Sequence, residues 1–88
     1  MTPEQNTQEK IDTLRTQVKH ALDNYYNGIG DVKPANVYDM VMGEIEPPLL
    51  KATLAFVNGN QTLAAKVLGI SRGTLRKKLE THHLIAAN

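Results

Sequence analysis

The fold of this chain is constrained most by residues 60–79, which read Asn-Gln-Thr-Leu-Ala-Ala-Lys-Val-Leu-Gly-Ile-Ser-Arg-Gly-Thr-Leu-Arg-Lys-Lys-Leu. Asn60 and Ser71 are of the residue types that cap the first turn of a helix. Gly69 lies between them, where a chain that leaves a helix often takes the left-handed backbone conformation that glycine adopts most easily. The segment therefore predicts a short helix, a tight turn at Gly69 and a second short helix.

The side chains of this segment divide into apolar and basic faces. Ala65 is small enough to let a crossing helix approach, and Ile70 can fill the angle between the two helices. Leu75 and Leu79, four residues apart, would face a core. The residues left for the outer faces are Arg72, Gly73, Thr74, Arg76, Lys77 and Lys78. The pattern is typical of a helix-turn-helix that places one helix in the major groove of DNA. An ordinary helical hairpin with a solvated basic face is the alternative.

Charge is unevenly distributed along the chain, although the net charge is only +1. Residues 1–57 hold five lysines and arginines against eight aspartates and glutamates, a net charge of −3. Residues 58–88 hold five basic residues and one acidic residue, a net charge of +4. A basic element of this kind is the electrostatic footprint of phosphate binding. The acidic remainder disfavours wrapping DNA over the whole surface.

Length and composition exclude several classes of protein. The 88 residues predict one domain. The chain has no cysteine, which excludes a disulfide framework, a thiolate metal site and a catalytic thiol. It has no apolar run of about 18 residues and no signal-peptide pattern at its N-terminus. We therefore expect a cytoplasmic protein that does not associate with membranes.

Helical periodicity continues upstream of the turn. Residues 1–7 are polar and are expected to be flexible. An amphipathic helix is predicted from about Gln8 to Tyr26, with apolar positions at Ile11, Leu14, Val18, Leu22 and Tyr25. Turn-forming residues at 27–31 end it, and a second helix is predicted from Pro34 or Ala35 to about Val57. We interpret the chain as an all-α fold of four helices, with dimerisation helices in residues 8–58, a helix-turn-helix unit in 59–80 and a tail in 81–88.

Pro47 and Pro48 lie in the middle of the second predicted helix. A proline there removes a backbone hydrogen bond and clashes with the preceding turn, at a cost of about 3 kcal/mol. The apolar spacing nevertheless continues from Ile45 to Leu49 and Leu50. We interpret the segment as one long kinked helix, with two helices meeting at the prolines as the alternative.

The two long amphipathic helices favour a homodimer. A helix of about 22 residues is about 33 Å long, which is more than one small helix-turn-helix unit can cover. A second copy would cover the apolar faces and would present two recognition helices to two half-sites. A monomeric helical hairpin is the alternative. The residues expected in the dimer interface are Leu14, Val18, Leu22, Tyr38, Val41, Ile45 and Leu49.

Residues 59–79 strongly resemble the Fis family of bacterial nucleoid-associated DNA-bending proteins, through Gly59-Asn60-Gln61-Thr62 and Arg72-Gly73-Thr74-Leu75-Arg76-Lys77-Lys78-Leu79. The resemblance extends upstream without gaps to about Leu14. It implies an intertwined homodimer in which the long second helix crosses its partner near the two-fold axis. In that family the recognition helices lie too close together for straight DNA, so the duplex bends. Binding then tolerates many sequences and favours A·T-rich centres, which deform at lower cost.

The resemblance also implies residue roles. Arg72 is expected to read a guanine edge through O6 and N7, and the other expected contacts are to phosphates or groove edges. The complete set of expected DNA-binding residues is Asn60, Thr62, Ser71, Arg72, Thr74, Arg76, Lys77 and Lys78. Ser71 stands where the family commonly has asparagine, and Leu63 where it often has arginine, so we expect weaker binding or altered tolerance. Only 13 residues precede Leu14, so we expect recombination-enhancer activity to be absent or reduced.

Other functional classes find little support in the sequence. His82 and His83 are adjacent, so they would point in different directions and make a poor metal pair; we expect exposed tail residues. No glycine-rich phosphate loop is present, and we expect no enzymatic activity, cofactor, metal ion or small-molecule ligand. The alternative function is an adaptor whose acidic half binds a partner such as RNA polymerase. The resemblance implies a polymerase contact near Val57-Asn58-Gly59.

Overall fold

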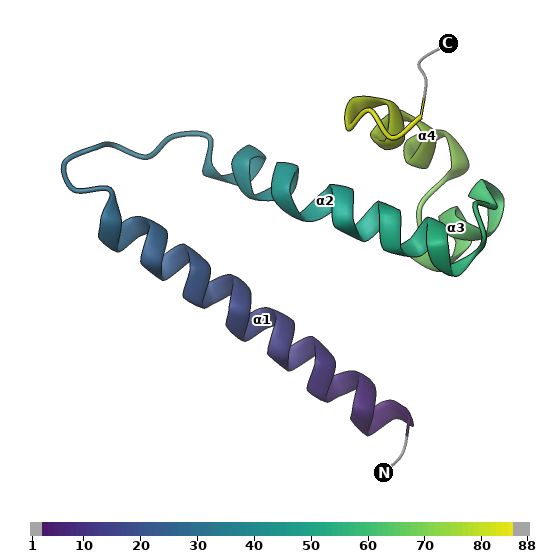
Figure 1. The fold of residues 1–88 in the computed structure, drawn as a ribbon, viewed down its shortest axis with the longest axis horizontal. Helices are drawn as coiled ribbons and strands as arrows, with labels where there is room; N and C mark the ends of the chain where they lie inside the picture. The colour runs from purple at the N-terminus through teal and green to yellow at the C-terminus, as the bar shows by residue number, and fades with distance from the viewer. Residues whose placement is uncertain (1–2, 86–88) are drawn as a thin grey trace. The chain divides into compact units, whose positions relative to one another are not determined.

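The computed structural model describes residues 3–85, with side chains described from Thr7 onward. The described residues form four helices and no strand (Figure 1): α1 (Pro3–Gly28), α2 (Val37–Phe56), α3 (Gln61–Leu68) and α4 (Arg72–Thr81). The prediction of an all-α chain with four helices is therefore confirmed. The chain divides into two units, Met1–Ala35 with α1 and Asn36–Asn88 with α2, α3 and α4.

The first unit is a single long helix and the turn that follows it. α1 begins at Pro3, so the predicted start near Gln8 was wrong by five residues. Proline is compatible with a first helical turn, because the N–H that it lacks would have no partner there. Flexibility of residues 1–7 stays a prediction, and residues 1 and 2 lie outside the described part.

The helix α2 runs without interruption through Pro47 and Pro48 (Figure 1). The interpretation of this segment as one helix is confirmed. Its predicted start at Pro34 or Ala35 was wrong, because α2 begins at Val37, after Asn36 takes a left-handed conformation with φ of 57°. The helix ends at Phe56, one residue before the predicted end.

The turn between α2 and α3 uses two residues with left-handed backbone. Asn58 and Gly59 have φ angles of 55° and 82°. The Gly59 N–H donates to the Leu54 carbonyl at 2.8 Å, and the Asn58 N–H donates to the Ala55 carbonyl at 3.2 Å. These two bonds satisfy carbonyls that the helix end would otherwise leave without a partner.

The helix-turn-helix itself forms as its sequence predicts. The Asn60 side chain accepts a hydrogen bond from the Leu63 N–H at 3.1 Å, and Gly69 has a left-handed φ of 76°. The Ile70 N–H then donates to the Ala65 carbonyl at 3.1 Å. The Ser71 hydroxyl accepts from the Thr74 N–H at 3.1 Å and starts α4. Both caps and the glycine turn are therefore confirmed.

The cap at Asn60 gives a stability prediction. Asn60→Ala removes the acceptor for an N–H of the first turn of α3, so we expect the free energy of unfolding to fall by about 0.5–2 kcal/mol. Asn60→Asp keeps an acceptor at the same place and should stay close to wild type. Urea denaturation followed by circular dichroism measures both. Equal losses for the two variants would contradict the capping role.

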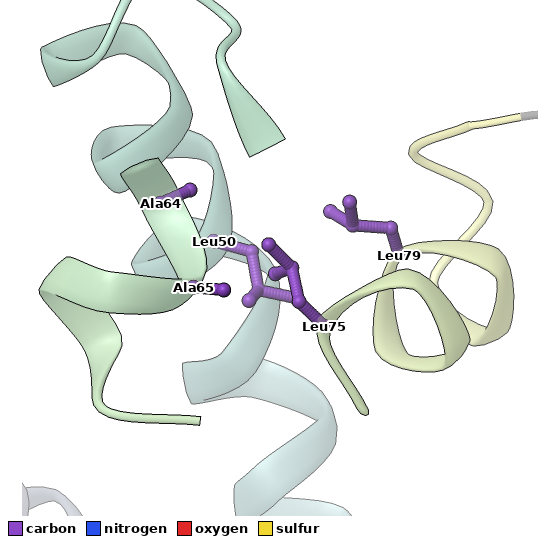
Figure 2. Packing of buried hydrophobic residues seen from close by; sticks show 5 residues of the cluster. All are labelled: Leu50, Ala64, Ala65, Leu75 and Leu79. Carbon is purple, nitrogen blue, oxygen red and sulfur yellow. The ribbon is translucent and has the colours of Figure 1, made fainter. Parts of the chain in front are cut away.

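A small apolar core joins α2, α3 and α4. Figure 2 shows Leu50 of α2 meeting Leu75 of α4 beside Ala65 of α3, with Ala64 and Leu79 nearby. These five side chains are buried, and Leu75 and Leu79 are fully so, which confirms the predicted core positions of these two leucines. Partly buried apolar residues pack around them: Leu54, Val57, Leu68, Ile70, Leu84 and Ile85.

The residues after α4 complete this core. His83 takes a left-handed φ of 57°, and the Leu84 N–H donates to the Leu79 carbonyl at 2.8 Å. This bond folds the chain back over the helix end, a common way to terminate a helix. Leu84 and Ile85 thereby reach the core, although the sequence suggested no role for them.

Candidate nucleic-acid interface

The N-terminal end of α4 presents the groups expected to meet DNA. Arg72 is the first residue of the helix and its side chain is exposed. The free N–H groups and the dipole of a first helical turn favour an anion such as phosphate. The Ser71 hydroxyl accepts from the Thr74 N–H and donates to the Thr74 hydroxyl oxygen at 2.8 Å. The Ser71 hydroxyl is thus already bonded to Thr74, while the Thr74 hydroxyl can still donate its own proton to an acceptor.

The four basic side chains of α4 expected to contact DNA divide into two without an ion-pair partner among the described residues and two with one. Arg72 and Lys77 are exposed and form no ion pair with any described residue. Arg76 lies with its Nε 3.3 Å from Glu80 Oε1, and Lys78 lies with its Nζ 2.8 Å from Glu46 Oε2. Sequence reasoning placed all four on outer faces and missed both pairings.

Two further expected contacts lie at the start of α3. Asn60 and Thr62 are exposed, and the Asn60 side chain serves as the helix cap. Lys66, which the sequence did not assign to the interface, is also exposed and stands three residues after Leu63 on α3. In a helix-turn-helix the first helix crosses the DNA backbone, and an exposed lysine there suits that position.

Glu46 of α2 receives two side chains from the C-terminal part of the unit. Besides Lys78, it lies 2.8 Å from His82, between its Oε1 and the ring Nε2. The His82 hydrogen bond, and then Lys78, lower the pKa of the Glu46 carboxyl below its ordinary value. The side chain of His82 is only 15% exposed, so the expectation of an exposed tail residue was wrong for His82; His83 is exposed.

The lowered pKa of Glu46 gives a pH prediction. A glutamate whose folded-state pKa is depressed adds stability above its unfolded pKa of about 4.3 and loses it as the pH falls through the folded-state value. We expect Glu46→Gln to unfold at lower urea than wild type at pH 7 and this gap to narrow by pH 3. Glu44→Gln, on an exposed side chain of the same helix, is the control and should show a small gap at both pH values. A Glu46→Gln gap that does not change with pH would contradict the prediction.

The apolar residues expected in a dimer interface are absent from the buried core of the chain. Leu14, Tyr38 and Leu49 are 59%, 75% and 49% exposed. Val18, Leu22, Val41 and Ile45 are partly buried. Large exposed apolar side chains that form a contiguous patch are typical of a surface that another molecule covers. The role of these seven residues in dimerisation stays a prediction.

Among the described residues, no helix has the length and apolar character needed to cross a membrane. No three His, Asp or Glu side chains in this part of the chain are grouped as metal ligands would be.

Comparison with known proteins assigns the family. The model of the family described as bacterial regulatory proteins of the Fis family matches residues 41–82, which include α3 and α4. The chain is 48% identical over 69 residues to the DNA-binding protein Fis of Mannheimia haemolytica and to that of Haemophilus ducreyi, and each alignment covers 78% of this chain and 70% of the relative. It is 42% identical over 79 residues to the DNA-binding protein Fis of Yersinia enterocolitica, covering 88% of this chain and 81% of the relative. The chain therefore belongs to the Fis family of bacterial regulatory proteins.

Proposed function

We propose that this chain binds double-stranded DNA through its helix-turn-helix, with α4 in the major groove, and acts in nucleoid organisation and transcription regulation. The main support is the surface of α4. Arg72 and Lys77 are exposed and unpaired, and Thr74 has a hydroxyl proton to donate. Leu75 and Leu79 of the same helix are fully buried. α4 is thus held by the core while Arg72 and Lys77 face solvent.

Each exposed group of this surface suits a particular DNA contact. The Arg72 guanidinium can bond O6 and N7 of a guanine together. Lys77, Thr74 and Thr62 suit phosphate oxygens, which fix the register of the protein on the duplex. Arg76 can leave Glu80 for a phosphate at low cost, because partly exposed ion pairs contribute about 0–1 kcal/mol. Ser71 contributes less than a free side chain would, since its hydroxyl proton is already donated to Thr74.

The proposed binding unit is a homodimer that bends DNA. The exposed apolar side chains of α1 and α2 support pairing, since a second copy would remove them from water. A two-fold dimer carries two copies of α4 and therefore contacts two half-sites. If the two copies of α4 lie closer together than successive major grooves of straight DNA, which are one helical turn apart, the duplex must bend. An A·T-rich centre then binds better because it deforms at lower cost.

The proposal is tested with two duplexes that share guanine flanks and differ in having an A·T-rich or a G·C-rich centre. Affinity is measured against salt concentration, and bending is measured by energy transfer between dyes at the duplex ends. We expect a steep salt slope from phosphate contacts, tighter binding to the A·T-rich centre and closer duplex ends in the complex. Sedimentation of the free protein should give a dimer. No binding at low salt would reject the DNA-binding proposal, and equal affinity without bending would reject the indirect readout.

A further inference from the structure

We propose that Glu46 is a positioning residue of the DNA interface, which fixes α4 through Lys78 and His82, so that Lys78 serves as an internal anchor and not as a ligand of a phosphate. This inference rests on the DNA-binding function proposed above. It reassigns one of the residues expected to contact DNA and adds two residues, Glu46 and His82, that were not among them.

The geometry of the three side chains supports an anchor. Lys78 and His82 are four residues apart, so they lie on one side of α4 and its C-terminal cap. They occupy different oxygens of the same carboxylate, each at 2.8 Å. Two bonds from neighbouring turns to one group on α2 restrict both the rotation of α4 about its axis and its translation along it. Leu75 and Leu79 supply burial, but apolar contacts are not directional.

The anchor is only partly open to solvent. The side chains of Lys78, Glu46 and His82 are 38%, 23% and 15% exposed. Hydrogen bonds to an ionised carboxylate are shorter and stronger than neutral ones, and partial burial reduces screening. His82 can donate through Nε2 as a neutral ring or as an imidazolium. The contact therefore does not require a charged histidine.

The anchor lies directly beside the surface proposed to meet DNA. A shallow hollow is lined by Glu46 and Lys78 together with Thr74, Lys77 and Thr81. A carboxylate at this place would repel phosphates unless its charge were neutralised. Lys78 neutralises Glu46, whereas Lys77 next to it in sequence is exposed and has no ion-pair partner among the described residues. The two lysines are therefore assigned different tasks.

A comparison of four proteins tests the assignment: wild type, Glu46→Gln, Lys78→Met and the double variant. Affinity for the A·T-centred duplex is measured from 50 to 200 mM salt, a range over which phosphate contacts dominate the change in affinity. We expect each single variant to bind more weakly, by up to about tenfold per subunit, because DNA binding must then supply the energy to fix α4 that the charge-assisted hydrogen bond supplied. The double variant should be no worse than the weaker single variant, and the salt slope should change little. Lys77→Met, by contrast, should lower the slope by about one unit per subunit, or about two for the proposed dimer.

The opposite assignment makes a different prediction for Glu46. If Lys78 were a phosphate ligand held back by Glu46, Glu46→Gln would release it and tighten binding. Lys78→Met would then lower the salt slope by about one unit per subunit. Glu44→Gln removes the same charge from an exposed position on α2 and corrects for the general electrostatic gain. Tighter binding of Glu46→Gln than of Glu44→Gln would overturn the proposal.

Two further measurements separate positioning from simple stabilisation. Melting temperatures of the single and double variants without DNA show whether Glu46 and Lys78 stabilise the free protein together. If the variants melt earlier but bind DNA with wild-type affinity well below their melting points, the positioning role is overturned. His82→Gln keeps an N–H donor and should bind within about twofold of wild type, whereas His82→Leu should resemble Glu46→Gln. If wild type binds no DNA at all, the proposed function fails, and coupling in the melting temperatures would then report only a structural contact.

Discussion

Arg72→Ala is expected to weaken binding to a duplex with guanine flanks by at least about 30-fold. One bidentate arginine–guanine contact contributes about 1–3 kcal/mol of discrimination. The proposed dimer would make two such contacts, and each 1.4 kcal/mol is about tenfold in affinity. Arg72 is exposed and forms no ion pair with a described residue, so its removal should leave the folded protein intact. Affinities are measured by fluorescence anisotropy at fixed salt, with melting temperatures alongside.

The control for this variant is Lys33→Ala, which removes one positive charge from an exposed residue between α1 and α2. It should bind within about twofold of wild type, because Lys33 is not among the residues proposed to contact DNA. A second duplex has other bases in place of the flanking guanines. Wild type should bind this duplex much more weakly than the first, whereas Arg72→Ala should bind the two duplexes with similar affinity. An Arg72→Ala protein that still distinguishes the two duplexes would contradict the assigned role. An adaptor function, in contrast, would leave partner binding unchanged in Arg72→Ala.

Leu75→Ala is expected to produce the largest loss of stability. The Leu75 side chain is fully buried between α2 and α3, where it meets Leu50 and Ala65 (Figure 2). Truncating a buried leucine to alanine costs about 2–5 kcal/mol through lost transfer free energy and the cavity left behind. A typical domain has only about 5–15 kcal/mol of stability, so a large share would be lost. DNA binding should fall with it, because α4 loses its attachment to the core.

Leu63→Ala is the matched control for this change. Leu63 belongs to α3 and its side chain is 46% exposed, so the same truncation should cost under about 1 kcal/mol. Guanidinium unfolding followed by circular dichroism compares the two variants with wild type. If Leu75→Ala lost no more unfolding free energy than Leu63→Ala, the core around Leu75 would not be what stabilises the unit.

The sequence alone determined the helix-turn-helix. Asn60, Gly69 and Ser71 act on backbone groups within a few residues of themselves, so their side-chain chemistry is enough to place both helix starts and the turn between them. Leu75 and Leu79 follow from helical periodicity in the same way. The local sequence also predicted that α2 continues through its two prolines, because the spacing of its apolar residues is unbroken there.

Only the tertiary structure decided which polar side chains are free. Glu46 and its two partners are separated by 32 and 36 residues, and no local pattern relates them. Their meeting depends on where α4 lies against α2, which the buried leucines determine together. The same packing brings Leu84 and Ile85 back to the core. Sequence periodicity identifies the polar side chains that lie outside the core. How the two helices cross then decides which of these side chains face solvent and which contact one another.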